Sequence, residues 1–269
     1  MYMDSLRIGC VKYLNARPLI RGWPGNVEFD HPSALCQRLA SGQLDVALVS
    51  SFEFLRNPIY RIIDGVSISS DGPVHSVVVA HRGAFSDIEQ IELDPASETA
   101  ANLLRCLLAE LKSRLSGSIA GRTGRMPMFH PSNRARLIIG DQAIRFRQNH
   151  ADAYQFWDLG EQWKKLTGLP FVYALWLIRP EVPDAKSIAQ RLRVLRDENL
   201  ADIPAIVSDA VADAAHNKQT IIQEFLDRYY HEYLRFGFGA REKQGFQTFA
   251  DLCAKHGVLP KRGRDFSLV

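Results

Sequence analysis

Leu6-Arg7-Ile8-Gly9-Cys10-Val11 is a largely apolar run that predicts a buried first strand, and Tyr13-Leu14-Asn15-Ala16-Arg17-Pro18 follows it directly. The second stretch is typical of a polar turn that leads into a short helix. Open α/β sheets bind ligands in the crevice at the carboxyl ends of their strands. The turn around Asn15 is therefore a candidate for the edge of a binding site.

Strand and helix patterns alternate outward from this first strand. Apolar runs at residues 26–29 and 44–49 flank a helical pattern that Ser33 is expected to cap and Gly42 to end. A further strand is expected at residues 74–80. The β-α-β-α-β order predicts right-handed crossovers and a largely parallel sheet with helices on both faces.

A second unit begins near residue 83. Leucines at helical spacing follow an expected cap at Ser97, and the stretch 113–136 has the composition of an irregular segment. Later patterns predict a helix that contains Trp163 and ends at Gly168. Almost continuous helix is predicted from residue 185 onward. Strand patterns lie at residues 126–129, where the signal is weak, and at 137–139, 154–159 and 171–178.

The composition is that of an ordinary globular protein. The 269 residues could form one large domain or two smaller ones, with 46% hydrophobic and 23% charged residues. The net charge of +3 comes from 33 basic and 30 acidic residues spread along the chain, which argues against a nucleic-acid partner. The four scattered cysteines are expected to be reduced core residues. Neither a signal peptide nor a membrane span is evident, which predicts a cytoplasmic protein.

Motifs for the common cofactors are missing from the sequence. The eight histidines lack the spacing of a metal site, and neither the glycine-rich dinucleotide fingerprint nor the phosphate-binding loop occurs. A nucleophile elbow of the form G-x-S-x-G is missing as well. The sequence therefore argues against a zinc site and shows no sign of a dinucleotide or triphosphate site.

Polar residues recur after apolar runs and at helix starts. Hydroxyl groups and helix amino termini at such places offer several donors to a carboxylate, which suits a small organic anion. Each residue taken alone is more often a helix cap or a turn residue, whereas the set together favours a binding edge. The set comprises Asn15, Ser50, Ser51, Ser69-Ser70-Asp71-Gly72, Ser97, Thr99 and Gly140-Asp141.

Five blocks, in order along the chain, carry a family resemblance. They are YLNARP at 13–18, GQLDVALVS at 42–50, SSDGPVHS at 69–76, IGD at 139–141 and TGLPFV at 167–172. Together they resemble the chorismate dehydratases of the futalosine route to menaquinone, and the resemblance covers most of the chain. It implies an α/β, type II periplasmic-binding-protein fold with a ligand cleft between two lobes. The first lobe would comprise residues 1–82 with 178–269, and the second residues 83–177.

The resemblance also implies the reaction, in which chorismate loses water to give 3-[(1-carboxyvinyl)oxy]benzoate without a cofactor. The hydroxyl at C4 leaves, the proton at C3 is lost, and aromatisation drives the step. Asn15 is the implied catalytic residue, because its amide would orient the departing hydroxyl or the C3 proton. The proton acceptor would be Asp71, Asp141 or, as we favour, a carboxylate of the substrate. The implied substrate-binding residues are Arg17, Ser50, Ser51, Ser70, Asp71, Ser76, Ser97, Thr99 and Asp141.

The chain departs from the family pattern at one helix start. Glu98 and Ala100 stand where an arginine and a serine are expected, which could weaken carboxylate binding or change the ligand, and Arg17 could compensate. Ala16 replaces a common threonine. Two alternatives stay open: a non-catalytic cytoplasmic binding protein for a small aromatic or cyclic carboxylate, and the sister enzyme that makes dihydroxynaphthoate on the same fold. The sister enzyme carries different opening residues from those at 13–15.

Overall fold

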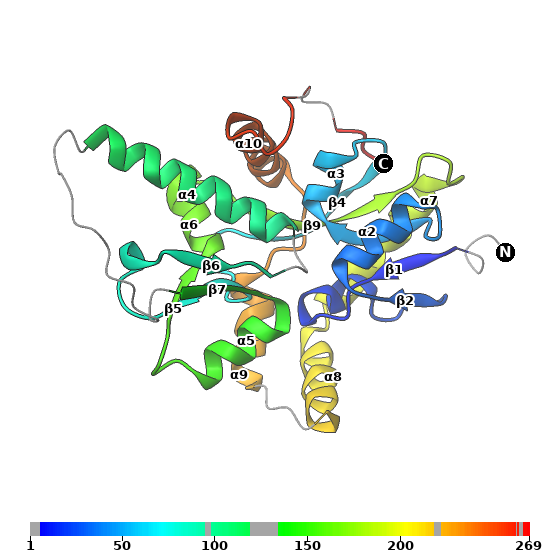
Figure 1. The fold of residues 1–269 in the computed structure, drawn as a ribbon. Coiled ribbons are helices and arrows are strands. Elements are labelled where there is room, and N and C mark those ends of the chain that lie inside the picture. The colour runs from blue at the N-terminus through cyan, green and yellow to red at the C-terminus, as the bar shows by residue number, and fades with distance from the viewer. Residues whose placement is uncertain (1–5, 95–97, 119–133, 218–221, 262, 264–265) are drawn as a thin grey trace.

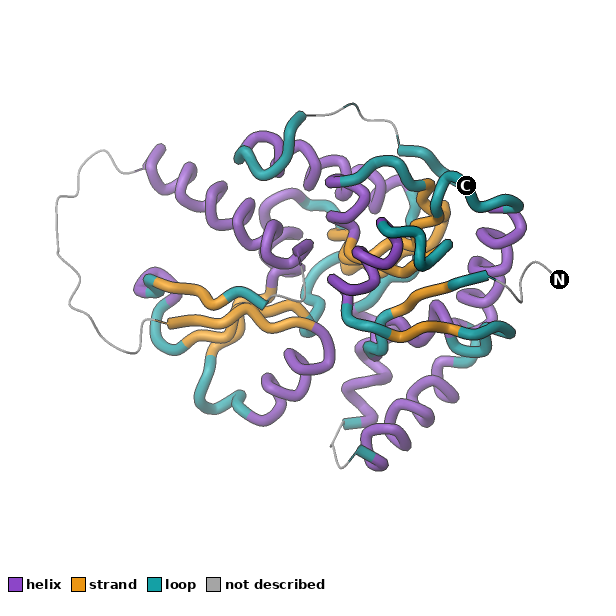
Figure 2. Tube along the Cα trace, turned by 45° about the vertical axis from the view of Figure 1, so that its right-hand side comes forward, coloured by secondary structure: helices purple, strands orange, loops and turns teal. Residues whose placement is uncertain are grey.

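The strands of the computed structural model form two separate sheets, which lie beside each other in Figure 1 and again in the rotated view of Figure 2. The structure describes residues 6–94, 98–118, 134–217, 222–261, 263 and 266–269. The first sheet has the order β2(Val27–Phe29), β1(Ile8–Cys10), β3(Val46–Ser50), β9(Phe171–Ile178), β4(Arg61–Ser70). The second has the order β6(Gln90–Glu92), β7(Arg134–Ile139), β5(Val77–His81), β8(Gln155–Asp158).

The first sheet is mixed, so the prediction of a largely parallel sheet was wrong. β1 pairs in parallel with β2 and β3, as the alternation of strands and helices predicted. β9 lies between β3 and β4 and runs antiparallel to both. A strand buried on both faces is apolar along its length, and such a run carries no sign of its direction. The pairing of β9 is long-range and could not be inferred from neighbouring segments.

The chain passes from the first sheet to the second between β4 and β5, and it returns between β8 and β9. β5 pairs with β7 and β8, although residues 77–81 fall inside the predicted first lobe. β9 belongs to the first sheet, although all but its last residue falls inside the predicted second lobe. Both crossings therefore come earlier than residues 83 and 178, because a break in sequence pattern marks loop composition and not strand pairing. The strand pattern at 126–129 lies outside the described residues.

Helices cover the faces of both sheets. In Figure 1, α4 lies above the second sheet and α5 below it, and alternate residues of β5 accordingly belong to two different apolar clusters. No helix among the described residues is both long and apolar enough to cross a lipid bilayer. The helices are η2(Leu14–Ala16), α1(Arg17–Ile20), α2(Pro32–Ala40), α3(Ser51–Arg56), η3(Phe85–Asp87), α4(Glu98–Ser118), α5(Gly140–Asn149), α6(Leu159–Thr167), α7(Ala185–Leu200), α8(Ile203–His216), α9(Gln223–Arg228), the π-helix η4(Tyr229–Tyr233) and α10(Ala240–Lys255).

Two predicted helix ends can be compared with the structure. Helix α2 begins at Pro32 with His31 as its N-cap, so the cap predicted at Ser33 was wrong by two residues. Proline favours the first helical position because it has no N–H to satisfy there, and it thereby shifts the start. The helix around Trp163 ends at Gly168 as predicted, with this glycine in the left-handed conformation. The cap predicted at Ser97 lies outside the described residues.

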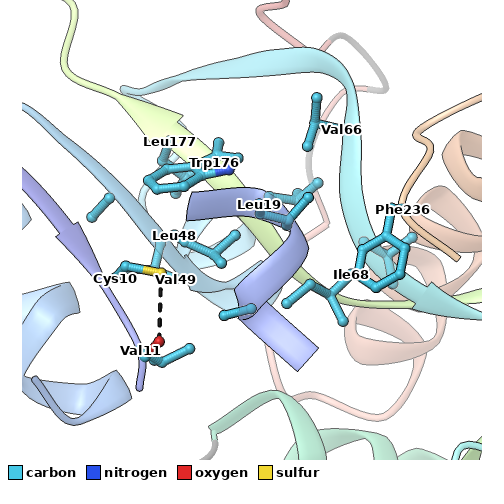
Figure 3. Packing of buried hydrophobic residues seen from close by; sticks show 14 of the residues in the cluster. Cys10, Val11, Leu19, Leu48, Val49, Val66, Ile68, Trp176, Leu177 and Phe236 are labelled. Atoms are coloured by element: carbon cyan, nitrogen blue, oxygen red, sulfur yellow. Dashed lines mark hydrogen bonds between the residues drawn. The ribbon is translucent and has the colours of Figure 1, made fainter. Parts of the chain in front are cut away.

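One large apolar core extends under both sheets. Figure 3 shows side chains of β1, β3 and β9 packed together, with Cys10, Leu48 and Trp176 among them. The same view places Phe236 beside Ile68, since the segment after η4 forms a bridge between Ser69 and Arg235 along β4. All four cysteines are free and buried, which confirms their prediction as reduced core residues.

The carboxylate of Asp158 connects the two segments in which the chain crosses between the sheets, one between β4 and β5 and the other between β8 and β9. It is 3% exposed and accepts backbone hydrogen bonds from Val74 at 3.1 Å, from His75 at 2.8 Å and from Glu161 at 3.1 Å. The first two donors belong to the crossing between β4 and β5, and the third belongs to α6, on the return to β9. One buried side chain therefore fixes both passages between the sheets.

Replacing Asp158 with alanine should lower the free energy of unfolding by about 3 kcal/mol or more, because three buried N–H groups would lose their acceptor. Urea denaturation of the purified protein measures this change. Asp152→Ala, at an exposed carboxylate after α5, is the matched control and should lose much less. Equal losses in the two variants would contradict the role of these hydrogen bonds.

Candidate functional site

A cavity of about 70 Å³ lies between the two sheets, and we call it the inner cavity. Its wall includes the turn after β1, the end of β3 and part of β9 from the first sheet. The second sheet contributes the start of β5, the first turn of α4 and the junction of β7 with α5. Its lining residues are Val11, Tyr13, Asn15, Pro32, Leu48, Val49, Ser50, Ile68, Val74, Ser76, Val77, Thr99, Ile139, Gly140, Tyr173 and Ala174.

Asn15 presents an unsatisfied polar atom in this wall. Its Oδ1 atom is buried and has no hydrogen-bond partner among the described residues. Buried side-chain oxygens are almost always bonded in folded proteins, so an unpartnered one in a cavity wall indicates a place for a ligand. Asn15 is the middle residue of η2, whose conformation therefore decides where the amide lies.

The preceding residue, Leu14, is held at both of its backbone groups. Its N–H donates to Asp141 Oδ1 at 3.0 Å, and its carbonyl accepts from the Tyr230 hydroxyl at 2.8 Å. Asp141 belongs to α5, beside the second sheet, whereas Leu14 follows a strand of the first sheet. The contact between Leu14 and Asp141 therefore crosses from one sheet to the other and fixes the helical turn that carries Asn15.

Hydroxyl groups supply the remaining polar wall. Ser50, at the end of β3, is hydrogen-bonded to Thr99 in the first turn of α4, so this pair also joins the two sheets. The oxygen of Ser76 accepts from the Tyr229 hydroxyl at 2.8 Å. The hydroxyl of Tyr173 lies 3.0 Å from Ser70 Oγ. These groups can donate to or accept from a ligand after small rotations about single bonds.

Two glycines allow the close approaches around the inner cavity. Gly140 has a φ of +60°, and a Cβ atom there would lie 3.4 Å from the ring of Tyr13. Gly160, in the first turn of α6, approaches the crossing so closely that a Cβ atom would lie 2.5 Å from the carbonyl oxygen of Gly72 and 2.6 Å from the Tyr173 hydroxyl. A side chain at Gly160 would push the crossing away from α6.

The inner cavity has an uncharged lining. None of the described residues in its wall is charged, and burial raises the pKa of Tyr173 well above its ordinary value, so this phenol stays protonated as a donor. Asp141 lies just behind the wall. Burial raises the pKa of its carboxyl group to about 6, and the hydrogen bond from Leu14 opposes that rise only in part. Neutral donors, rather than fixed cations, therefore face the space inside.

The structure brings together four of the predicted site residues. Asn15, Ser50, Ser76 and Thr99 line the inner cavity. Two more adjoin it without lining it: Ser70 contacts Tyr173, and Asp141 contacts Leu14.

Three predicted site residues lie outside the wall. Arg17 pairs with Asp213 at 2.6 Å. Asp71 pairs with Lys164 at 2.5 Å and with Arg241 at 3.1 Å. Ser51 is fully buried and donates to the carbonyl of Val172 at 2.7 Å. In each case a protein partner occupies the group, which the sequence could not reveal because those partners lie more than 90 positions away. Ser97 lies outside the described residues.

The structure also shows where Glu98 and Ala100 lie, the two residues that depart from the family pattern at the start of α4. Glu98 lies in the first turn of α4 and forms an ion pair with Arg56 at 2.6 Å, where both side chains are exposed. Ala100 is 1% exposed. The carboxylate of Glu98 is not part of the wall of the inner cavity.

Sequence reasoning missed two aromatic residues of the wall, Tyr13 and Tyr173. Tyr13 opens the first family block, so its position beside Asn15 was a usable signal. Tyr173 directly follows the last block and lies within a predicted strand, where alternation could have placed it on one face. Tyr229 is 1% exposed, and its hydroxyl donates a hydrogen bond to Ser76. The described residues contain no group of three or more potential metal ligands.

Comparison with known proteins identifies one matching family over almost the whole chain. The sequence model of the family described as menaquinone biosynthesis matches residues 6–255. The chain is 28% identical over 262 residues to the chorismate dehydratase of Thermus thermophilus, an alignment that covers 91% of this chain and 93% of that protein.

Solved structures with a similar fold include binding proteins. The protein AF1704 of Archaeoglobus fulgidus superposes with a TM-score of 0.68 at 13% identity, covering 94% of this chain and 98% of that one. The periplasmic aliphatic sulphonate binding protein SsuA of Escherichia coli superposes with a TM-score of 0.60 at 14% identity, covering 96% and 94%. These similarities show the fold, which is α/β and of the periplasmic-binding-protein type, as predicted.

The pKa of Asp141 gives a stability test. The folded protein holds this proton up to about pH 6, whereas the unfolded chain releases it near 3.8. The stability that this group contributes is therefore fully present below about pH 4 and is lost as the pH rises through 6. Asp141→Asn keeps an acceptor for Leu14 but does not titrate. Relative to this variant, the wild type should lose stability between pH 4 and pH 7 in urea denaturation.

Asp152→Asn, at an exposed carboxylate after α5, is the matched control and should show no such trend. A stability difference between wild type and Asp141→Asn that stays constant across this pH range would contradict the burial of Asp141 in the folded protein.

Proposed function

We infer, because the chain belongs to the menaquinone biosynthesis family, that it is a hydro-lyase that dehydrates chorismate to 3-[(1-carboxyvinyl)oxy]benzoate. The observation that carries this inference within the site is the buried and unpartnered Oδ1 atom of Asn15 in the wall of the inner cavity. A cavity between two sheets with neutral donors fits a small cyclic acid. The futalosine route is a finer part of the same proposal and rests on the five sequence blocks. A cytoplasmic location is a further part of it, as expected of an enzyme of biosynthesis.

In the proposed reaction the protein positions the substrate and assists the departure of water. The amide of Asn15 bonds the C4 hydroxyl or orients the C3–H bond, so that the leaving group and the proton are correctly aligned. The hydroxyls of Ser50, Ser76 and Thr99 hold the substrate carboxylates. Because these donors are neutral, they orient the dianion without requiring the burial of a protein charge.

The proton at C3 requires an acceptor. An amide is too weak a base, and no carboxylate belongs to the described wall of the inner cavity. Asp71 is paired with Lys164 and Arg241, and Asp141 faces the backbone of Leu14. These contacts support the proposal that a carboxylate of the substrate takes the proton.

Substrate binding requires the two lobes to separate. The inner cavity measures about 70 Å³, whereas sites for small organic ligands usually measure about 300 Å³ or more. We propose that the lobes meet at the crossings β4–β5 and β8–β9, and that opening breaks the Ser50–Thr99 and Leu14–Asp141 contacts. Closure around the substrate would remake them and exclude water.

Purified protein incubated with chorismate should produce an aromatic product with one molecule of water fewer. Ultraviolet spectra and mass spectrometry of the product measure this directly. Thermal stabilisation by chorismate without any product would contradict the enzymatic function. It would instead favour the alternative, a non-catalytic binding protein.

Replacing Asn15 with alanine should lower kcat by at least about a hundredfold and change the binding of chorismate much less, because orientation matters chiefly in the transition state. Single-turnover kinetics and calorimetric binding separate the two effects. Asn149→Ala, at the exposed end of α5, is the matched control. Unchanged turnover in Asn15→Ala would remove Asn15 from the mechanism.

A further inference from the structure

A second cavity of about 470 Å³ adjoins the inner cavity, and we call it the outer cavity. The two share Val11 and Tyr13, so these residues belong to the walls of both cavities. The outer cavity is formed by the turn after β1, by α1 and the segment behind it, by β2 and by one face of α8. Its lining residues are Val11, Lys12, Tyr13, Arg17, Ile20, Arg21, Gly22, Trp23, Gly25, Asn26, Val27, Phe29, Asp209 and Asp213.

The charges of the outer cavity do not cancel. Arg17 pairs with Asp213 at 2.6 Å, and Arg21 pairs with Asp209 at 2.7 Å. Lys12 has no hydrogen-bond or ion-pair partner among the residues that the structure describes. The cations exceed the carboxylates by one, so the cavity presents a net positive charge at its mouth.

The apolar part of the outer cavity suits a ring. Trp23 is 8% exposed, and its indole N–H is buried without a partner among the described residues. Phe29 is 50% exposed, which is unusual for a phenylalanine in a folded protein. Apolar side chains next to an unpaired ammonium group fit a cyclic carboxylate better than they fit a wholly polar or a wholly apolar ligand.

The inner cavity lacks the positive charge of the outer cavity. Its described wall contains no charged residue, so it has little attraction at a distance for an anion that carries two charges. A concave site with an excess of one charge raises the local concentration of ligands of opposite charge and increases their rate of association. The positive charge nearest the inner cavity along the chain is Lys12, which directly precedes Tyr13.

We propose that the outer cavity is a docking site for dianionic cyclic carboxylates, which bind there before they pass Tyr13 into the inner cavity. Where the ligand is chorismate, this proposal rests on the proposed function. Lys12 attracts the carboxylates, Trp23 and Phe29 contact the ring, and the two arginines are held at the rim by their aspartates. If the arginine–aspartate pairs served only to join α1 to α8, changing their charge would alter stability and leave association unaffected.

The test changes the net charge of the outer cavity in both directions. Lys12→Gln removes one positive charge, and Asp213→Asn adds one by releasing Arg17. At low ionic strength, kcat/KM for chorismate should fall about fourfold in the first variant and rise by a similar factor in the second, while kcat changes much less. Both effects on kcat/KM should disappear at about 0.5 M salt, because salt screens the attraction between exposed charges that lie several ångströms apart.

Lys186→Gln is the matched control, because Lys186 is exposed, lies at the start of α7 and lines neither of these cavities. It should leave kcat/KM unchanged at every salt concentration. Thermal unfolding of each variant confirms that it is folded. Equal kcat/KM values in the wild type, Lys12→Gln and Asp213→Asn at low salt would overturn the docking site.

A second measurement does not depend on turnover. Isophthalate, a benzene ring with two carboxylates, should quench tryptophan fluorescence in the wild type and not in Trp23→Phe. Its affinity should shift with Lys12→Gln and Asp213→Asn in the same directions as kcat/KM. If the wild type fails to convert chorismate, the proposed function fails, and this measurement still decides the docking site. Quenching by isophthalate that persists in Trp23→Phe would overturn the docking site. An affinity for isophthalate that is the same in the wild type, Lys12→Gln and Asp213→Asn would overturn it as well.

Discussion

A single buried carboxylate, that of Asp158, determines where the chain changes sheets. Its oxygens accept N–H groups from the crossing between β4 and β5 and from the first turn of α6, so both passages depend on one side chain. Ser76 is the last residue of the first crossing, and its hydroxyl reaches the inner cavity because that crossing is fixed. Gly160 lies two residues beyond the carboxylate and permits the close approach of Gly72. The architecture of the fold and the position of a cavity-lining hydroxyl thus have the same physical origin.

The two cavities divide between them the tasks of attracting and orienting a ligand. Neutral hydroxyl and amide groups line the inner cavity. A fixed cation that bound the carboxylates of the substrate and of the transition state equally would contribute little to the rate of the chemical step. Charged groups lie outside it, around Lys12 and the rim formed by α1 and α8. Tyr13 stands between the two regions. In the proposed enzyme, association depends on the outer region and chemistry on the inner one.

The sequence predicted local elements well and long-range partners poorly. β1, β3 and β9 were located because buried strands leave apolar runs, and Asn15 was singled out because it follows such a run. The antiparallel direction of β9 leaves no trace in its composition. Arg17 and Asp71 were predicted as site residues because they lie in family blocks, yet each is paired with residues of distant helices. Partners of this kind depend on tertiary packing and cannot be inferred from short motifs. The family blocks supplied what periodicity could not, since Ser76 entered the prediction only through them.

The hydrogen bond between Asp141 and Leu14 links conformation to acidity. Its acceptor lies beside the second sheet and its donor beside the first, so the carboxylate is shielded from water only while the two sheets stay close. Motion that separates them hydrates Asp141 and returns it to the strength of an ordinary carboxylic acid, with release of any proton that it held. Acidic surroundings therefore favour the closed arrangement and alkaline surroundings the open one. Between about pH 4 and pH 6, the proposed separation of the lobes is therefore linked to the release of one proton by Asp141.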